Sequence, residues 1–223
     1  SGLDGADLPD PVTPLDGTDG VGFIIDSCRA EEGLWLVPTG PLTNIGMAFR
    51  QAPDLPDRIA GVSLMGGGTF GNRSAVAEFN LWADPHAVEA VLASDLDVEF
   101  VGWDISRRDA VVEPELADEL RSLGSPVAEF CIDIQRVVAE FCATDTKLAG
   151  FDLPDPIAMA YAIEPAVATE VRHLNLRVET SSELTRGMVV MDLLGFTGEA
   201  PNALVVTAAD RERFVTMLRA ALA

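Results

Sequence analysis

The sequence predicts an α/β protein with an open, mostly parallel, Rossmann-like sheet flanked by helices. Short, continuous apolar runs alternate along the chain with segments of helical period, which is the pattern of a parallel sheet covered on both faces. The chain has 223 residues, and 48% of them are hydrophobic. It is therefore long and apolar enough for one large domain, and we treat residues 1–223 as a single domain.

The first half of the chain alternates between helix and strand. It opens with an acidic surface loop at 1–20 that is rich in Asp, Pro and Gly and has no apolar period. Pro53 lies where the second helix should stop, and Asp84 with Pro85 offers an N-cap and a first-turn proline for the third. The predicted helices are 21–30, 42–50 and 83–93, and the predicted strands are 34–37, 59–65 and 98–103.

The second half begins with helices alone. Segments 114–123 and 127–141 have helical spacing with no strand between them, so we expect a helical, cap-like region at 110–150. A short helix at 155–162 follows, then a predicted β pair at 183–192 and 203–207 and a closing helix at 210–222.

The charge balance excludes one class of partner. Fifteen Lys and Arg against 36 Asp and Glu give a formal charge of −21, and Lys147 is the single lysine. A nucleic acid polymer needs clustered cations, so it is not an expected partner. The near absence of Lys favours a salt-adapted, halophilic surface, with ordinary acidity as the alternative.

The chain carries no sequence signal for a membrane or an oxidising compartment. It has no run of eighteen apolar residues and no pattern of a signal peptide, and its three cysteines form no C-x-x-C pair. We expect no membrane partner and a cytoplasmic location.

Two loops follow predicted strands and are rich in Gly and small polar residues, at 38–44 and 66–72. Chemistry in parallel sheets collects at such strand ends. Gly66-x-Gly68-x-x-Gly71 matches the dinucleotide fingerprint, which would indicate a dinucleotide-dependent oxidoreductase. In that fingerprint a helix begins at the third glycine, whereas the next clear helix in this sequence begins only near Asp84. The sequence after Gly71 therefore argues against a dinucleotide site.

Asn72, Glu78 and Asn80 lie just past the second of these loops. In an extended segment Glu78 and Asn80 point the same way, and two carboxamides with one carboxylate offer the donors and acceptors that bind vicinal sugar hydroxyls. Capping of the loop by the same side chains is the alternative.

Asp155 stands in Leu153-Pro154-Asp155-Pro156, before an apolar helix. It can be an N-cap with Pro156 in the first turn, or a ligand for a hard cation together with a backbone carbonyl from a strand-end loop. His86 and His173 fit no metal-ligand spacing, and we expect each to be a surface histidine or a structural one with its hydrogen bonds satisfied.

Taken together, these segments resemble the inosine-uridine preferring nucleoside hydrolase family, in the same order along most of the chain. The motifs that carry the resemblance are Ser1-Gly2-Leu3-Asp4-Gly5, Val37-Pro38-Thr39-Gly40-Pro41-Leu42-Thr43-Asn44-Ile45, Met65-Gly66-Gly67-Gly68, Gly71-Asn72, Ala77-Glu78-Phe79-Asn80, Ala83-Asp84-Pro85, Gly102-Trp103-Asp104, Asp155-Pro156-Ile157-Ala158 and Thr185-Arg186-Gly187.

The resemblance implies the nucleoside hydrolase fold and an N-glycosyl hydrolase that cleaves purine or pyrimidine ribonucleosides into ribose and base, with a Ca²⁺ ion that activates water. It further implies that Thr39 gives its backbone carbonyl and Asp155 its carboxylate to Ca²⁺, and that Asp155 also contacts the ribose. Asn72 and Glu78 would bind the 5′-hydroxyl side and Asn80 the 2′- and 3′-hydroxyl side. A homo-oligomer, either dimer or tetramer, is the implied assembly.

Two departures from the family pattern limit what the resemblance implies. The family's Asp-rich N-terminal strand, which supplies the general base and most calcium carboxylates, has no counterpart, so we expect an N-terminally incomplete fold that is inactive by itself. The alternative is a non-catalytic homologue that binds nucleosides or sugars. Pro154 stands where some members carry a His that protonates the leaving base, which leaves the base preference open, and Trp82, Phe130 and Phe141 are candidates to stack on the base.

Overall fold

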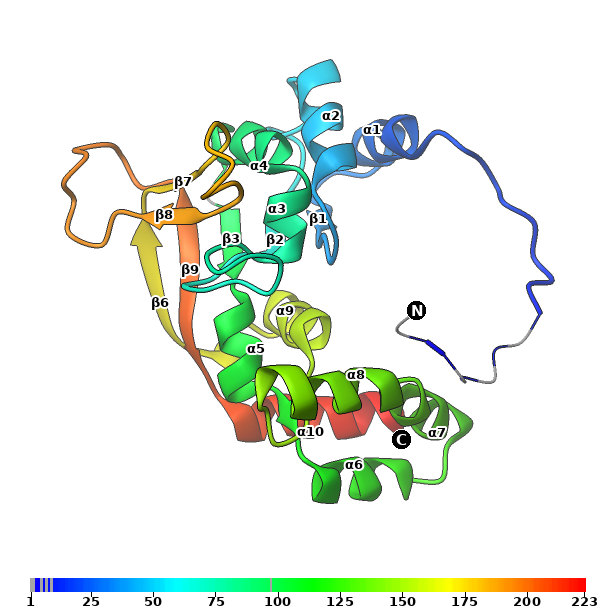
Figure 1. The fold of residues 1–223 in the computed structure, drawn as a ribbon. Helices are drawn as coiled ribbons and strands as arrows, with labels where there is room; N and C mark the ends of the chain where they lie inside the picture. The colour runs from blue at the N-terminus through cyan, green and yellow to red at the C-terminus, as the bar shows by residue number, and fades with distance from the viewer. Residues whose placement is uncertain (1–2, 5, 7, 9, 97) are drawn as a thin grey trace.

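The computed structural model describes residues 3–4, 6, 8, 10–96 and 98–223. Its centre is a five-stranded sheet in the order β1-β2-β3-β9-β6 (Figure 1). The first four strands run parallel and β6 pairs antiparallel with β9 at one edge, so the predicted fold class is confirmed. The strands are β1 (Trp35–Leu36), β2 (Gly61–Met65), β3 (Val98–Val101), β9 (Ala203–Ala209) and β6 (Ala168–Leu174).

Both faces of the central strands are covered. Every residue of β2 and β3 is buried, which explains why their sequences show a continuous apolar run instead of alternation. Val62 and Leu64 point into a core that includes the helices of the first half, whereas Met65 and Val101 point to the opposite core.

The helices of the first half form the first of these cores. They are α1 (Gly20–Ala30), α2 (Thr43–Gln51), α3 (Phe79–Ala83) and α4 (Pro85–Leu92), as Figure 1 shows along one side of the sheet. Asp84 caps α4 through the backbone N–H of Ala87 at 3.0 Å, and Pro85 occupies its first turn, as the sequence predicts. The one-turn helix α3 is not anticipated by the sequence pattern.

Three helices cover the other side of the sheet: α5 (Trp103–Asp109), α9 (Pro154–Ile163) and α10 (Arg211–Leu222). The prediction carried the third strand on to Trp103, but the chain turns into α5 at that residue. The short 3₁₀ helix Pro165–Val167 joins α9 to β6. None of the helices in the described part of the chain is long and apolar enough to cross a membrane.

The segment between α5 and α9 is helical, and a small antiparallel pair of strands closes it. Its elements are β4 (Val111–Val112), α6 (Pro114–Arg121), α7 (Pro126–Asp133), α8 (Arg136–Phe141), the π-helical turn Cys142–Thr146 and β5 (Phe151–Asp152). The single helix predicted at 127–141 is therefore two helices, because the chain turns at Ile134 and Gln135.

The predicted β pair at 183–192 and 203–207 is wrong. Residues Val189–Met191 form β8, which pairs with β7 (Leu176–Val178) in a separate hairpin. The strand β9 instead lies inside the main sheet between β3 and β6, because its buried residues need neighbours on both sides.

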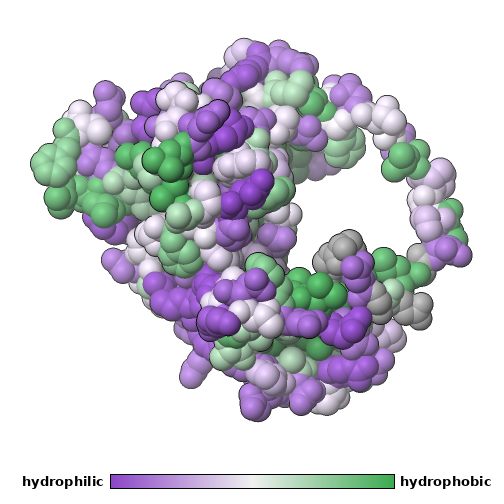
Figure 2. Space-filling model, in the orientation of Figure 1, coloured by the Kyte–Doolittle hydropathy of each residue, from purple (hydrophilic) through white to green (hydrophobic). Residues whose placement is uncertain are grey.

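The acidic segment before α1 is irregular from Asp10 to Asp19, and its residues are exposed, as Figure 1 shows in the blue trace that leads to α1. Asp19 caps α1 by accepting the N–H of Gly22 at 2.8 Å. Ser1, Gly2 and Gly5 of the first motif lie outside the described residues. Figure 2 shows hydrophilic residues over much of one face of the molecule, in keeping with the acidic composition.

Candidate functional site

The loops after three parallel strands meet at one edge of the sheet. The N–H of Met65 donates to the Pro38 carbonyl at 3.1 Å, which ties the loop after β1 to the end of β2. The N–H of Gly66 donates to Val101 at 3.1 Å, and Trp103 donates to the Gly67 carbonyl at 2.8 Å. The two loops singled out in the sequence are thus joined to each other and to the end of β3.

The glycines after β2 are required by both conformation and space. Gly67 has φ +65° and Gly68 has φ +135°, which side chains rarely adopt. A Cβ atom on Gly67 would lie 2.6 Å from side-chain atoms of Phe100 and Val189. No helix opens at Gly71, since residues 71–77 form a turn and α3 begins only at Phe79. The glycine spacing therefore lacks the helix terminus that a dinucleotide site needs.

Glu78 is buried at the centre of this edge, with 3% of its surface exposed. Its carboxylate accepts the N–H groups of Gly67 at 3.0 Å and Asn80 at 2.9 Å, and that of Leu81 at 3.3 Å. Glu78 is thereby the N-cap of α3. The predicted extended segment from Glu78 to Asn80 is wrong, because this capping turns the chain into a helix.

Burial raises the pKa of Glu78 against the pull of its three backbone donors, and the charge of Asp155 raises it further. The two carboxylates lie 77 positions apart in the sequence, and folding brings them close enough for the charge of one to act on the other. Two carboxylates near one another at a strand-end edge create a negative potential there.

Each of the two asparagines uses one polar atom of its side-chain amide for a hydrogen bond within the protein. Asn80 is buried and donates through Nδ2 to the Met65 carbonyl at 3.1 Å, which leaves its Oδ1 as an acceptor. Asn72 is exposed and accepts the Phe79 N–H on Oδ1 at 2.9 Å, which leaves its Nδ2 as a donor. The capping interpretation of Asn72 and Glu78 is confirmed by these contacts, and free donor and acceptor groups remain beside them.

Asp155 is not the N-cap of α9, which was one of the two roles predicted for it. Pro154 is already the first residue of α9 and Leu153 is the N-cap, so Asp155 lies in the first turn. Within the described part of the chain its carboxylate has no hydrogen-bond partner. The side chain is exposed, yet the atoms packed around it restrict its hydration and raise its pKa.

Thr39 is exposed in the loop that follows β1, directly after the carbonyl that binds Met65. The other predicted residues are linked to one another. Glu78 accepts the N–H of Asn80, and Asn72 accepts the N–H of Phe79, which lies between them. The charge of Asp155 acts on Glu78. Among the residues that the structure describes, no hydrogen bond or ion pair joins Thr39 to them.

Ligands for a metal ion are few at this edge. The described residues contain no group of three or more His, Cys, Asp and Glu side chains that could hold an ion. A calcium ion takes six to eight oxygens, so one carboxylate and one carbonyl do not fit such a site by themselves.

No separate role was predicted from the sequence for Asp104 or for the two arginines that lie beside Trp82. Asp104 accepts the Thr69 hydroxyl at 3.0 Å and its N–H at 3.3 Å, bridging the loops after β2 and β3. The ring of Trp82 has the guanidinium of Arg73 4.0 Å from its centroid and that of Arg186 at 5.9 Å. Asp104 and Arg186 stand in motifs quoted above, which was the available signal.

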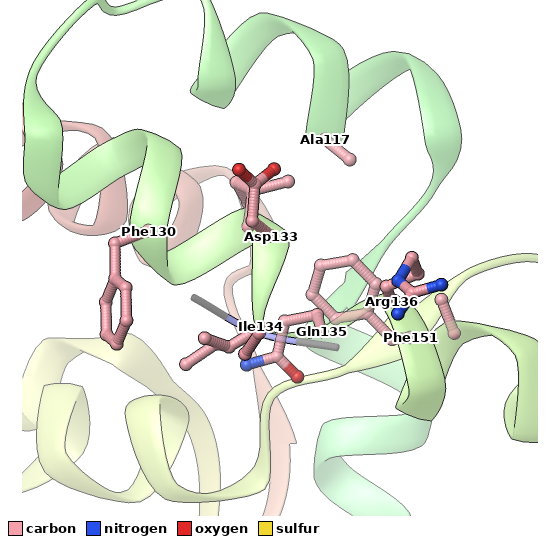
Figure 3. A pocket seen from close by; sticks show the side chains of 10 residues that line it. Ala117, Phe130, Asp133, Ile134, Gln135, Arg136 and Phe151 are labelled. Atoms are coloured by element: carbon pink, nitrogen blue, oxygen red, sulfur yellow. The ribbon is translucent and has the colours of Figure 1, made fainter. Parts of the chain in front are cut away.

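A cavity of about 490 Å³ lies elsewhere, among α6, α7, α8 and β5. Figure 3 shows side chains that line it, including Phe130, Asp133 and Arg136. None of the five predicted site residues lines this cavity, so its size does not make it the strand-end site. Phe130 belongs to this cavity, and Phe141 is 52% exposed on α8.

Comparisons with known proteins show the family and the fold of the chain. A family model described as inosine-uridine preferring nucleoside hydrolase matches residues 1–216. A pyrimidine-specific ribonucleoside hydrolase, RihA, from Escherichia coli strain SMS-3-5 is 34% identical over 222 residues, which are 98% of this chain and 70% of the relative.

Solved structures give the same picture. A purine-preferring ribonucleoside hydrolase from Gardnerella vaginalis superimposes with a TM-score of 0.88 at 28% identity, covering 99% of this chain and 70% of that one. A plant nucleoside hydrolase, PpNRh1, shares the fold with a TM-score of 0.85 at 22% identity, covering 99% of this chain and 71% of that one.

Proposed function

The chain belongs to the inosine-uridine preferring nucleoside hydrolase family, whose members are N-glycosyl hydrolases, and on that premise we propose that its strand-end edge binds the ribose of a ribonucleoside for cleavage of the N-glycosidic bond. The observation that carries the proposal is the pairing of a buried carboxylate, Glu78, with an unbonded one, Asp155, at the carboxyl ends of the parallel strands. Beside them lie the free amide groups of Asn72 and Asn80.

The donor and acceptor pattern suits a sugar. Asp155 and the Oδ1 atom of Asn80 accept from hydroxyl groups, and we assign them to the 2′- and 3′-hydroxyl side. The Nδ2 atom of Asn72 donates and Glu78 accepts on the 5′-hydroxyl side. The oxygens of Glu78 keep unused lone pairs beyond the backbone bonds that they accept.

The negative charge of the site suits the reaction. Cleavage of an N-glycosidic bond builds positive charge on the ribosyl ring, and preorganised carboxylates stabilise such a charge. Hydrogen bonds to the ribose hydroxyls hold the ring in a fixed orientation, which lowers the entropic part of the barrier. Glu78 is well placed for this because three backbone donors fix its carboxylate before any ligand arrives.

The proposal assigns only two ligands of a calcium site to this chain. We propose that Thr39 gives a carbonyl and Asp155 a carboxylate to a Ca²⁺ ion, but these two oxygens are too few for tight binding, and we derive no step through the ion. We therefore expect this chain to bind Ca²⁺ weakly and to release no ribose by itself. The base preference stays open, since Pro154 has no proton to donate and one face of Trp82 carries Arg73.

A non-catalytic nucleoside-binding role is the second candidate, favoured by the same shortage of metal ligands in the described residues. One experiment separates the two. Ribose release from inosine and from uridine is measured with and without Ca²⁺, for this chain and for a longer chain that includes upstream sequence. Release by the longer chain supports the hydrolase, whereas nucleoside binding without release in either chain supports the binding role.

A further inference from the structure

Helix α3 and its N-cap carry Glu78 and Asn80, two of the side chains proposed to bind ribose. The helix is too short to be stable without contacts from the rest of the protein. It spans Phe79–Ala83, and isolated helices of this length are not stable in water. Its N-terminal N–H groups are satisfied by Glu78. The groups at its other end, the carbonyls of the last turn, need a partner of their own.

Arg186 supplies that partner from a segment about a hundred positions further along the chain. Its Nε donates to the Trp82 carbonyl at 3.0 Å, and its Nη2 donates to the Ala83 carbonyl at 3.3 Å. A cation at the C-terminal end of a helix is favourable, and the planar guanidinium can bond two carbonyls at once. The same guanidinium lies over the Trp82 ring.

The loop that carries Arg186 is ordered by its own contacts. It connects β7 and β8 beside α3 (Figure 1), and the carboxylate of Glu179 accepts the N–H groups of Ser181 at 2.7 Å and Ser182 at 3.1 Å. Gly187 donates to the Glu179 carbonyl at 2.8 Å. A Cβ atom on Gly187 would lie 2.5 Å from the Trp82 Cα, so the loop rests directly on α3.

The hairpin is anchored on the far side as well. Arg177 of β7 pairs with Glu89 of α4 at 3.0 Å, and Val178 donates its N–H to the same carboxylate at 2.5 Å. Val189 of β8 packs against Gly67, whose N–H binds Glu78. The hairpin thus reaches the ribose side chains from two directions.

Arg186 differs from most described arginines in what it binds. Arg29, Arg121 and Arg219 each pair with a carboxylate on the surface. Within the described part of the chain Arg186 is assigned no carboxylate partner, and its hydrogen bonds go to backbone carbonyls of α3. It is half-buried, so replacing it leaves two carbonyls without their donor.

We propose that Arg186 is a positioning residue of the ribose site: it caps the C-terminal end of α3 and so holds Glu78 and Asn80 in place. This inference rests on the proposed function of that site, since it takes Glu78 and Asn80 to bind ribose. In this role Arg186 acts through α3 and not through a contact with the substrate.

Amide hydrogen exchange tests the positioning without any ligand. In Arg186→Gln the N–H groups of Asn80 and Leu81, which bind Glu78, are expected to exchange at least tenfold faster, while that of Phe100 in β3 stays within twofold. Arg186→Lys keeps the positive charge but loses the planar guanidinium that bonds two carbonyls at once. The exchange rates of this variant should therefore lie between those of the unaltered chain and those of Arg186→Gln. The matched control is Arg219→Gln, which removes a surface arginine of α10 that pairs with Glu119 and should leave the exchange of Asn80 and Leu81 unchanged.

Two outcomes of the exchange experiment overturn the proposal. The first is unchanged exchange at Asn80 and Leu81 in Arg186→Gln. The second is an equal acceleration at Phe100, which would show a general loss of stability.

Calorimetry with ribose and inosine adds the functional arm. Arg186→Gln should weaken binding at least tenfold. Arg186→Lys should recover part of this loss, and Arg219→Gln should bind like the unaltered chain. Equal binding by all variants contradicts the proposal. If the unaltered chain binds neither ligand, the proposed function fails, and the exchange rates still decide whether Arg186 holds α3.

Discussion

Glu78 serves the capping role that the sequence left open for it and keeps acceptor groups for the proposed sugar-binding role. It caps α3, and it remains an acceptor because a carboxylate has more lone pairs than the backbone N–H groups use. The sequence identified the residue type and position. It did not show the local conformation, because the capping bonds exist only once Gly67 has been brought beside Glu78 by folding.

Asp155 shows how a one-residue shift changes a role. The sequence places a proline on either side of it, and each can begin a helix. The helix begins at Pro154, so the carboxylate is left unbonded within the described residues instead of serving as a cap. We expect Asp155→Asn to lower the free energy of unfolding by no more than about 0.5 kcal/mol, since no described contact is lost, and the raised pKa of Asp155 favours a gain at neutral pH. Urea unfolding checks this, and a larger loss would show a structural role.

Another buried carboxylate, Glu99, has no hydrogen bond or ion pair to the predicted site residues among the residues that the structure describes. It stands opposite Ser63 in β3 and β2, and its Oε2 atom has no hydrogen-bond partner. Burial raises the pKa of Glu99, and Ser63 offsets this only in part, because the Ser63 hydroxyl itself forms no regular hydrogen bond. Burial, with the nearby Glu99 charge, also raises the pKa of Tyr161 to about 12.

Replacing Glu99 should therefore stabilise the protein in a pH-dependent way. A carboxyl whose pKa is higher in the folded than in the unfolded chain opposes folding above the unfolded value, and this penalty vanishes well below it. Glu99→Gln is expected to raise the free energy of unfolding at pH 7 by about 1–3 kcal/mol, and by much less near pH 3.5. Urea unfolding at both pH values measures this, with the exposed Glu183→Gln as control. A gain that is the same at both pH values would contradict the assignment.

At the scale of elements, the sequence predicted most of what local pattern decides. The helices α1, α2, α4, α9 and α10 lie close to their expected positions, because apolar period and capping residues are local. The pairing of β9 was predicted wrongly, since it depends on which buried neighbours the whole sheet supplies. The helix α3 was missed because its conformation depends on Glu78 and Arg186, and not on a period of its own.

The turn before α3 gives an element-scale prediction. Arg73 and Ser74 both donate to the Ala77 carbonyl, and a Cβ atom on Gly71 would lie 2.1 Å from that oxygen. Gly71→Ala should displace Asn72 and cost about 1–3 kcal/mol of stability, as overpacking does. Gly40→Ala is the matched control in the loop after β1, because nothing lies within 4 Å of its Cβ position.

Thermal unfolding and ribose binding of the two glycine variants check this prediction. Gly71→Ala should lower both the stability and the affinity, and Gly40→Ala should change neither. Equal behaviour of the two variants would show that the turn does not set the position of Asn72.

For the whole molecule, the alternation of apolar runs and helical segments predicted a sheet covered on both faces, whereas composition says little about the site. The net charge of −21 concerns the surface, and only two of the 36 acidic residues, Glu78 and Asp155, are assigned to the site. The acidic balance excludes a polymer of phosphates as an expected partner, whereas a nucleoside carries no phosphate to be repelled.

The same charge gives a prediction about salt. If the surface is salt-adapted, mutual repulsion of the carboxylates destabilises the fold at low ionic strength, and molar KCl screens it within about 3 Å. The melting temperature should therefore rise steadily from low salt to molar KCl. A melting temperature that does not change across the series would favour ordinary acidity over salt adaptation.

The claim that the strand-end edge is a ribose site is tested most directly by calorimetry with inosine and uridine on this chain and on Asp155→Asn. We predict that the unaltered chain binds nucleoside and that Asp155→Asn, folded to the same stability, binds at least tenfold more weakly, while the exposed Glu183→Gln binds like the unaltered chain. Equal binding by Asp155→Asn, or no binding by any chain, would contradict the assignment of this edge.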